Sequence, residues 1–454
     1  MVKTLQRRPY SGTTIAPATQ LKVKLSPTGK FLWVSPFNGS SRTRKIWNGT
    51  EYVNAPGAAV EIAEYFVGWT ADETYQVVVG RATGGTTRLY LRSVDPAGVL
   101  VALSSPATTV MSDTNAIRGL ERITGDTFIA YGQSAICVFR IDRGTNTIVI
   151  LNDSIFPDNP VRGIAGNGND NIIVVHSGAS GSVGFQTYSV NLSTGVLSPL
   201  GTKIIKAGNR INGFDYRDGK ILSHSFYTIS DVMFLQRDGG NALQPVPGFD
   251  ATVLQSNMTS ASAQTTASFI HLGFDGTEIT YLDQAAPAKF WSADVTTLQK
   301  SLPFVPPTDL PSGSTNGRQY GEDISRAFVS YTDDGKTMAV TFWVAAALQG
   351  VYVYTEYEDV TTAFLADVLL PTAFIDAVAV ESAQLLADVK LPSATVDLAK
   401  NGTAQLVADV KLPSAFMVTN NTLPAELVAD IAVPDAFIRQ RATKRNGIMV
   451  VQTL

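Results

Sequence analysis

The chain contains three histidines, and their spacing is regular. The separations between His176, His224 and His271 are 48 and 47, and each histidine is in or beside an apolar run expected to form a strand. Imidazole nitrogens are frequent ligands of zinc and other transition metals, so equivalent positions facing one channel could converge on an ion. No His-x-x-x-His pair and no neighbouring carboxylate cluster accompanies them. We therefore expect structural or solvent-facing histidines and predict no metal site.

A second polar cluster lies at Asn167, Asn169 and Asp170. Its oxygens suit calcium, but the downstream glutamate of a full calcium loop is missing. Gly166-Asn167-Gly168 is followed by Asn171 where a phosphate or dinucleotide loop needs a third glycine. The chain also lacks a Gly-x-Ser-x-Gly elbow. These patterns predict no catalytic residue and no cofactor, and hence a protein that is not an enzyme.

The remaining reactive side chains have structural interpretations. Cys137, the single cysteine, lies in the apolar run 135–139, which predicts a buried, inert thiol and excludes an internal disulfide. The pair Asp333-Asp334 falls in an expected turn and is predicted to shape a hairpin. Most tryptophans are expected in strand cores, although some could form sugar-binding surfaces; the five are Trp33, Trp47, Trp69, Trp291 and Trp343.

The composition favours strands joined by tight turns. Only 16% of the 454 residues are charged, against about a quarter in average proteins, and 37 glycines and 22 prolines supply turns. The net charge of −4 gives no basic surface for nucleic acid. The first ten residues lack an apolar signal-peptide core, and no run reaches the roughly 18 apolar residues of a membrane span. We expect no membrane insertion and no nucleic-acid partner.

Between residues 20 and 358 a polar turn followed by an apolar strand recurs seven times. Asp-Gly and Asn-Gly pairs in such turns supply the positive φ that hairpins need. The turn markers are Gly29, Asp72, Gly125, Gly168, Gly219, Gly276 and Gly335, and the successive intervals are 43, 53, 43, 51, 57 and 59. An aromatic-rich partner strand such as 89–94, 185–190 or 351–354 follows most units. Units of this length are typical of propeller blades, whereas a series of β-sandwiches would have shorter and less regular spacing.

This rhythm resembles that of β-propellers of the WD40-like and YVTN-like type. The resemblance rests on turns such as Ser193-Thr194-Gly195-Val196-Leu197 and Asp333-Asp334-Gly335-Lys336. The Gly-His and Trp-Asp signatures of WD40 repeats are absent. The fold expected is all-β: a seven-bladed β-propeller over residues 20–360, preceded by an N-terminal segment, 1–19.

A short β-repeat with a 21-residue period follows over residues 361–440, before a tail at 441–454. Its four copies align Phe364-Leu365-Ala366-Asp367 with the equivalent runs that end at Asp388, Asp409 and Asp430. We expect two short strands and two turns per copy, one strand spanning 406–412, with each apolar face covered only when copies stack. The residues assigned to assembly or docking are Asp367, Pro371, Asp388, Pro392, Asp409, Pro413, Asp430 and Pro434.

The charge-poor surface rich in Thr, Ser, Asn and Gly is typical of particles, and phage fibres carry short β-repeats of this kind. We therefore expect a bacteriophage virion protein of the tail, fibre or capsid-associated class, made in the host cytoplasm. It would attach to or recognise a host surface. Its expected partners are other virion proteins, further copies of itself and a host surface glycan. The alternatives are a bacterial propeller scaffold or adhesin and, third, a propeller lyase or glycosidase.

Overall fold

The computed structural model consists of strands and divides into two compact units, residues 5–356 and residues 1–4 with 357–454. The residues it describes are 3–9, 21–36, 43–56, 63–81, 87–95, 97–103, 107–108, 117–158, 160–178, 183–205, 211–225, 233–250, 253, 270–272, 278–283, 289–294, 297, 314–316, 329–344, 348–358, 361–366, 373–377, 382–387, 393–398, 403–408, 414–419, 425–429, 435–441 and 448–452. In these ranges no helix has the length and apolar character needed to cross a membrane.

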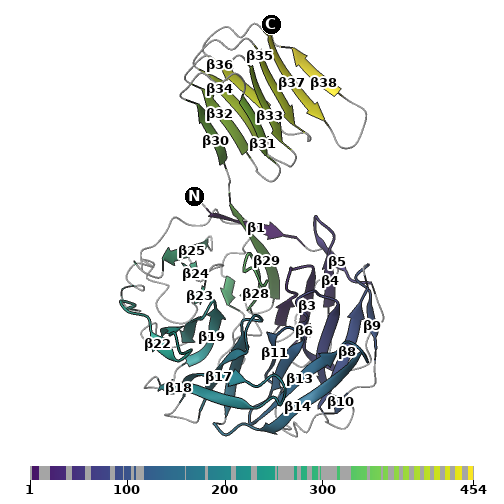
Figure 1. Cartoon of the computed structure of the whole chain (residues 1–454), viewed down its shortest axis with the longest axis vertical. Helices are drawn as coiled ribbons and strands as arrows, with labels where there is room; N and C mark the ends of the chain where they lie inside the picture. The colour runs from purple at the N-terminus through teal and green to yellow at the C-terminus, as the bar shows by residue number, and fades with distance from the viewer. Residues whose placement is uncertain are drawn as a thin grey trace. The chain divides into compact units, whose positions relative to one another are not determined.

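The larger unit is a β-propeller whose sheets follow one another around it (Figure 1). Blade 1 comprises β2 (Leu21–Leu25), β3 (Phe31–Pro36), β4 (Thr43–Trp47) and β5 (Tyr52–Asn54). Blade 2 comprises β6 (Ala63–Trp69), β7 (Tyr75–Arg81), β8 (Thr87–Val94), β9 (Leu100–Ala102) and β10 (Ala107–Thr108). Blade 3 comprises β11 (Gly119–Thr124), β12 (Thr127–Tyr131), β13 (Ala135–Asp142) and β14 (Thr147–Ile155).

The second half of the unit continues the same antiparallel pattern. Blade 4 comprises β15 (Val161–Gly166), β16 (Ile172–Ser177), β17 (Gly184–Val190) and β18 (Leu197–Ile205). Blade 5 comprises β19 (Ile211–Arg217), β20 (Lys220–Ser225), β21 (Phe234–Arg237) and β22 (Leu243–Pro245). Blade 6 comprises β26 (Ser314–Asn316), β27 (Val329–Tyr331), β28 (Thr337–Val344), β29 (Leu348–Glu358) and, from the other end of the chain, β1 (Lys3–Arg8).

The prediction of seven complete blades is wrong by one. Six sheets of this unit have four or five strands, and the repeat marked by Gly276 corresponds to a three-stranded sheet of β23 (Ile270–Leu272), β24 (Glu278–Asp283) and β25 (Lys289–Asp294). The turn and the strand after it recur here at the same interval as in the blades. The described residues of this sheet, however, form three strands and not the four of a complete blade. The propeller class itself is confirmed, in place of a series of β-sandwiches.

The apolar core lies between consecutive blades. β12 and β16 are buried at every residue, because each is a middle strand covered on both faces by neighbouring sheets. One cluster packs Val77 and Leu89 of blade 2 against Phe128 and Phe139 of blade 3. Similar clusters join blades 3 and 4, 4 and 5, 6 and 1, and 1 and 2. The continuous apolar runs of the sequence thus hold the ring of blades together by burial.

The smaller unit contains two mostly parallel sheets. One is β30 (Thr361–Ala366), β32 (Ser382–Ala387), β34 (Thr403–Ala408) and β36 (Ala425–Ala429). The other is β31 (Ala373–Ala377), β33 (Ser393–Leu398), β35 (Ser414–Thr419), β37 (Asp435–Arg441) and the antiparallel β38 (Ile448–Gln452). The chain alternates between the sheets, and each residue pairs with its equivalent in the next copy, as in Leu385↔Leu406↔Leu427.

Two strands per repeat were predicted, and two are present. β34 spans Thr403–Ala408 and so includes the first three residues of the predicted strand 406–412. Residues 409–413, including Asp409 and Pro413, lie outside the described part of the chain.

Candidate functional site

The first and second strands of three blades are joined by turns of one design. Ser26, Thr70 and Thr332 each accept, at the side-chain oxygen, a hydrogen bond from the backbone N–H five positions later, at 2.9, 3.1 and 3.0 Å. The residue three positions on has positive φ: it is Gly29, Gly335 or, in the middle case, Glu73. A hydroxyl residue followed three positions later by a left-handed residue thus fixes each turn.

These turns also connect blades 6, 1 and 2. The backbone N–H of Asp333 donates to the Pro27 carbonyl at 2.8 Å. Thr28 then donates from both its N–H and its hydroxyl to the Glu73 carboxylate, at 2.6 and 2.8 Å. Glu73 is 7% exposed, so its charge is held by these hydrogen bonds rather than by water. The turns act as inter-blade links.

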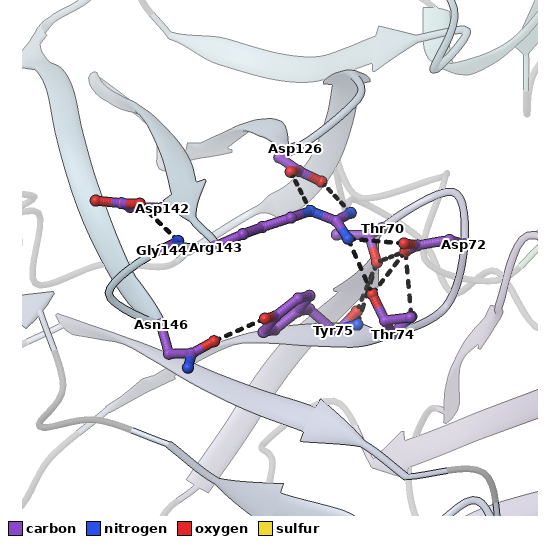
Figure 2. Close-up of polar contacts among 9 residues, drawn as sticks. All are labelled: Thr70, Asp72, Thr74, Tyr75, Asp126, Asp142, Arg143, Gly144 and Asn146. Carbon is purple, nitrogen blue, oxygen red and sulfur yellow. Dashed lines mark hydrogen bonds and ion pairs between the residues drawn. The ribbon is translucent and has the colours of Figure 1, made fainter.

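Arg143 forms the link between blades 2 and 3 (Figure 2). Its guanidinium binds Asp126 of its own blade at 2.6 Å and Asp72 of blade 2 at 2.8 Å. Partial burial would raise the pKa of Asp72, but hydrogen bonds from Arg143, Thr70 and Thr74 outweigh that effect and hold the pKa well below its usual range. The pKa of Arg143 is raised by its bonds to Asp126 and Asp72.

Three further contacts complete the circle of links. Thr124 and Asn169 form an isolated β-bridge between blades 3 and 4. Arg237 of blade 5 pairs with Asp170 of blade 4 at 2.9 Å. Arg217 of blade 5 donates to the Thr332 carbonyl of blade 6 at 3.2 Å. Each of the six blades is therefore tied to the next by a polar link that involves a turn following a first strand.

A cavity of about 360 Å³ lies inside these links. Its walls come from the ends of the first strands of all six blades and from the turns that follow them. The polar and aromatic residues of the wall are Lys24, Trp69, Glu121, Arg122, Asn167, Asn169, Asp215, Tyr216, Arg217, Asp218, Ser330, Tyr331, Thr332, Asp333 and Asp334. This volume lies at the lower end of the roughly 300–1,000 Å³ of small-molecule pockets.

Arg122 of β11 is part of this cavity wall and contacts two other blades. Its Nη2 pairs with the Asp333 carboxylate of blade 6, and its Nη1 lies 3.5 Å from the Trp69 carbonyl of blade 2. The side chain is 9% exposed. Two glycines leave room for Arg122. A Cβ at Gly168 would lie 2.4 Å from Arg122 Nη2, and a Cβ at Gly166 would lie 2.6 Å from the Arg122 carbonyl oxygen.

The cavity wall carries both signs of charge. Lys24, Arg122 and Arg217 face five acidic residues, Glu121, Asp215, Asp218, Asp333 and Asp334, a formal excess of two negative charges (3 − 5). Lys24 and Glu121 are 3.4 Å apart. Burial lowers the pKa of Arg217, whose guanidinium carbon lies 4.9 Å from the centre of the Tyr331 ring. The site therefore presents hydrogen-bond donors and acceptors together.

Two buried donors in the wall have no hydrogen-bond partner among the described residues. They are Trp69 Nε1 and Arg122 Nε. Trp69 is 3% exposed. An unpaired buried N–H costs about 1–3 kcal/mol, so both groups lower the stability of the folded chain.

The predicted metal candidates have other surroundings. His176 is buried, and its ring stacks on Phe185 at 4.6 Å and meets Phe214 edge-on at 5.9 Å. Burial, with smaller contributions from Arg162 and Lys203, lowers its pKa to about 3. His224 lies in β20 and His271 in β23, with side chains outside the described set. The described residues hold no group of three or more potential metal-binding side chains.

The other candidates from the sequence lie in turns or in the buried core. Asn167 Oδ1 accepts from the N–H groups of residues 169 and 170, and Asp170 binds both Ile172 N–H and Arg237. Asp334 accepts from Lys336 N–H, as the hairpin prediction requires. Cys137 is buried, and burial raises the pKa of its thiol. Trp33 and Trp69 lie in the core, as predicted for most tryptophans.

The residues assigned to assembly are one aspartate and one proline from each copy of the repeat. Asp367, Pro371, Asp388, Pro392, Asp409, Pro413, Asp430 and Pro434 all lie outside the described ranges, between the strands of the repeat. Sequence reasoning also missed Arg122, Arg143 and Arg217. The available signal was the pair Gly166 and Gly168, interpreted only as an incomplete phosphate loop, although it provides space for a buried arginine.

Comparison of the chain with models of known protein families and with curated protein sequences found no match.

Proposed function

We propose that this chain is a non-enzymatic structural protein of a bacteriophage particle, in the tail, a fibre or the capsid. The propeller would be displayed for attachment or host-surface recognition, and the C-terminal repeats would mediate assembly with further copies of the chain. The observation that carries this proposal is the in-register stacking of the repeat strands.

Each repeat strand pairs with the equivalent strand of the next repeat, so the repeats at the two ends of the sheet each leave an edge that an equivalent strand of another chain can match. β36 (Ala425–Ala429) repeats the Leu-Val-Ala run of β34, the strand with which it pairs. Among the described strands of this sheet, β30 and β36 are the two edge strands. Unpaired edges of this kind are templates for strand addition. β38 pairs with β37 and occupies one edge of the second sheet, which limits open-ended growth.

The charges of the propeller support a structural role. Arg143, Arg122 and Arg237 bind carboxylates of other blades, so these groups hold the ring together. A surface made polar chiefly by uncharged residues, with 16% charged residues in the chain, fits a protein packed among other particle proteins.

Two measurements test the proposal. Light scattering on the full chain and on residues 1–360, which keep every propeller strand, should give an oligomer for the first and a monomer for the second. Equal monomeric masses would refute the assembly role. Mass spectrometry of purified particles should detect the chain, whereas its presence only in the cytosol of uninfected bacteria would favour the bacterial scaffold or adhesin.

A further inference from the structure

We infer that β38 (Ile448–Gln452) is a displaceable cap that keeps a second copy of this chain from continuing both repeat sheets end to end. The inference rests on the proposed function and deepens it, because it names the edge, the partner strand and the register of the assembly contact. The partner is a second copy of this chain, and the place that its β31 would take beside β37 is occupied by β38.

The first step is the single rule by which the repeat strands pair. Every described pair of neighbouring repeat strands is parallel, and each residue lies opposite the residue 21 positions later. β30 and β31 begin the two sheets, and β36 and β37 are the last strands that follow the rule. The outer edge of a last strand is therefore equivalent to an edge that accepts a repeat strand inside the sheet. It fits the first strand of another copy.

The second step is the register that this rule sets for a second copy. In the first sheet, the row of paired residues that begins at Phe364 ends at Leu427. In the second sheet, the row of repeat residues that begins at Ile375 ends at Ile438. A second copy that continues both sheets places its own β30 beside β36 and its own β31 beside β37, in this register. Such a contact joins unlike edges and can repeat without end.

The third step is the difference between the two outer edges. Among the described strands of the first sheet, β36 has no strand beyond it. The matching edge of β37 carries β38, which runs antiparallel and pairs along residues 437–441 (Figure 1). β38 therefore takes the backbone hydrogen-bonding groups that β31 of another copy would need. While β38 is in place, the full chain associates through the first sheet alone.

The fourth step is the strength of the competition for β37. β38 follows β37 after only six residues, 442–447. A strand held by a short connection acts at an effective concentration on the order of 1 mM. For equal pairing, the β31 strand of a chain present at about 10 µM therefore competes with β38 at a disadvantage of roughly a hundredfold. Loss of β38 should release growth through both sheets.

The test compares the full chain with a chain that ends at Arg441, by light scattering over a range of chain concentrations. At about 10 µM we expect the shorter chain to form assemblies with an average mass at least about three times that of the full chain. A second variant, Met449→Pro with Val450→Pro, keeps the chain length. Successive N–H groups of a strand point to opposite sides, so one of these prolines removes a donor to β37 and should have the same effect. Thr453→Pro, after the end of β38, is the control and should behave as the full chain does.

A disulfide test checks the register of the contact. The pair Ile375→Cys and Ile438→Cys is three strand spacings, about 14 Å, apart within one chain, so a disulfide forms only between β31 of one copy and β37 of another. Oxidation should link the shorter chain into a ladder of multimers and leave the full chain unlinked. The native Cys137 is buried and does not compete. The control pair, Ala377→Cys and Asp435→Cys, is five residues out of register and should give no ladder.

The outcomes separate the cap from the assembly role. The inference is overturned if the shorter chain and the double proline variant keep the mass distribution of the full chain, or if they associate and the registered cysteine pair gives no more ladder than the control pair. Oligomers of the full chain that do not change on loss of β38 would refute the cap alone. Monomers of every variant would refute the cap and the assembly role together.

Discussion

Gly168 and Arg122 depend on each other at the boundary between blades 3 and 4. Gly168 has a φ of +77°, and its α-carbon approaches the Arg122 guanidinium so closely that a methyl group would overlap it. The arginine in turn connects blades 2, 3 and 6. One small residue thus permits an ion pair between residues 211 positions apart.

Gly168→Ala should therefore lower the free energy of unfolding by more than the cost of placing an alanine at a positive φ. Gly125→Ala is the control, because Gly125 also has positive φ, +51°, but has open space where a Cβ would be. We expect about 1 kcal/mol for Gly125→Ala and about 3 kcal/mol for Gly168→Ala, since Arg122 must also move. Urea unfolding measures both, and equal losses would contradict the proposed contact with Arg122.

Buried His176 makes stability depend on pH. Its pKa in the folded chain is about 3, below the ordinary value of 6.5 in the unfolded chain, so the unfolded state binds a proton first as pH falls. The contribution of the neutral ring is fully present above pH 6.5 and is lost progressively toward pH 3. Between pH 7 and pH 4 this costs roughly 3 kcal/mol, at about 1.4 kcal/mol per pH unit below 6.5.

His176→Leu should remove that part of the acid sensitivity, because leucine has similar volume and no titrating group. Denaturant unfolding at pH 7, 5.5 and 4 would show the free energy of unfolding of the wild type falling more steeply than that of the variant. Carboxylates titrate equally in both proteins, so the difference isolates the histidine. Parallel pH curves would show that His176 does not titrate as described.

At the scale of elements, turns and the strands after them were predictable from local chemistry. The runs expected after Gly29, Asp72 and Gly125 correspond to β3, β7 and β12, because a left-handed turn residue and an apolar run are both local signals. β1 was missed and was included in a segment without assigned structure. Its partner, β29, is the last strand of the propeller in chain order, and no local pattern specifies a pairing between such distant segments.

β1 closes the propeller, so its removal should destabilise the whole ring. It adds a strand beside β29, Pro9 accepts a hydrogen bond from Tyr52 N–H at 2.8 Å, and the Arg8 guanidinium lies 4.7 Å from the Trp47 ring. A chain lacking residues 1–9 should lose at least about 3 kcal/mol, given roughly 1 kcal/mol for each of several backbone hydrogen bonds.

Arg8→Ala is the control for this deletion, because it removes the cation–π contact with Trp47 and the side-chain hydrogen bond with Tyr52 but keeps the backbone of β1, and it should cost about 1–2 kcal/mol. Thermal and urea unfolding of the deletion, the point variant and the wild type compare the three. If the deletion and Arg8→Ala were equally stable, the pairing of β1 with β29 would contribute nothing to closure.

At the scale of the whole molecule, the class of fold was predictable and the number of blades was not. Repeated spacing identified a propeller, but the region after Gly276 repeats the turn and strand without four described strands. The cavity was also not predictable, since its walls come from strand ends and turns spread between Lys24 and Asp334 and meet only after the ring closes. The C-terminal repeat was the clearer signal, because identical intervals determine which strands pair.

The two compact units should unfold as separate cooperative transitions. Each has its own sheets, and both closing strands of the propeller, β1 and β29, are retained in residues 1–360. Calorimetry of the full chain should show two transitions, and residues 1–360 should keep the propeller transition within about 3 °C, because a change of about 1 kcal/mol would shift it by roughly that amount in a domain this large. A full chain with one transition, shifted strongly by removal of residues 361–454, would instead mean that the repeats stabilise the propeller, and the repeats would then have an intramolecular role in place of assembly.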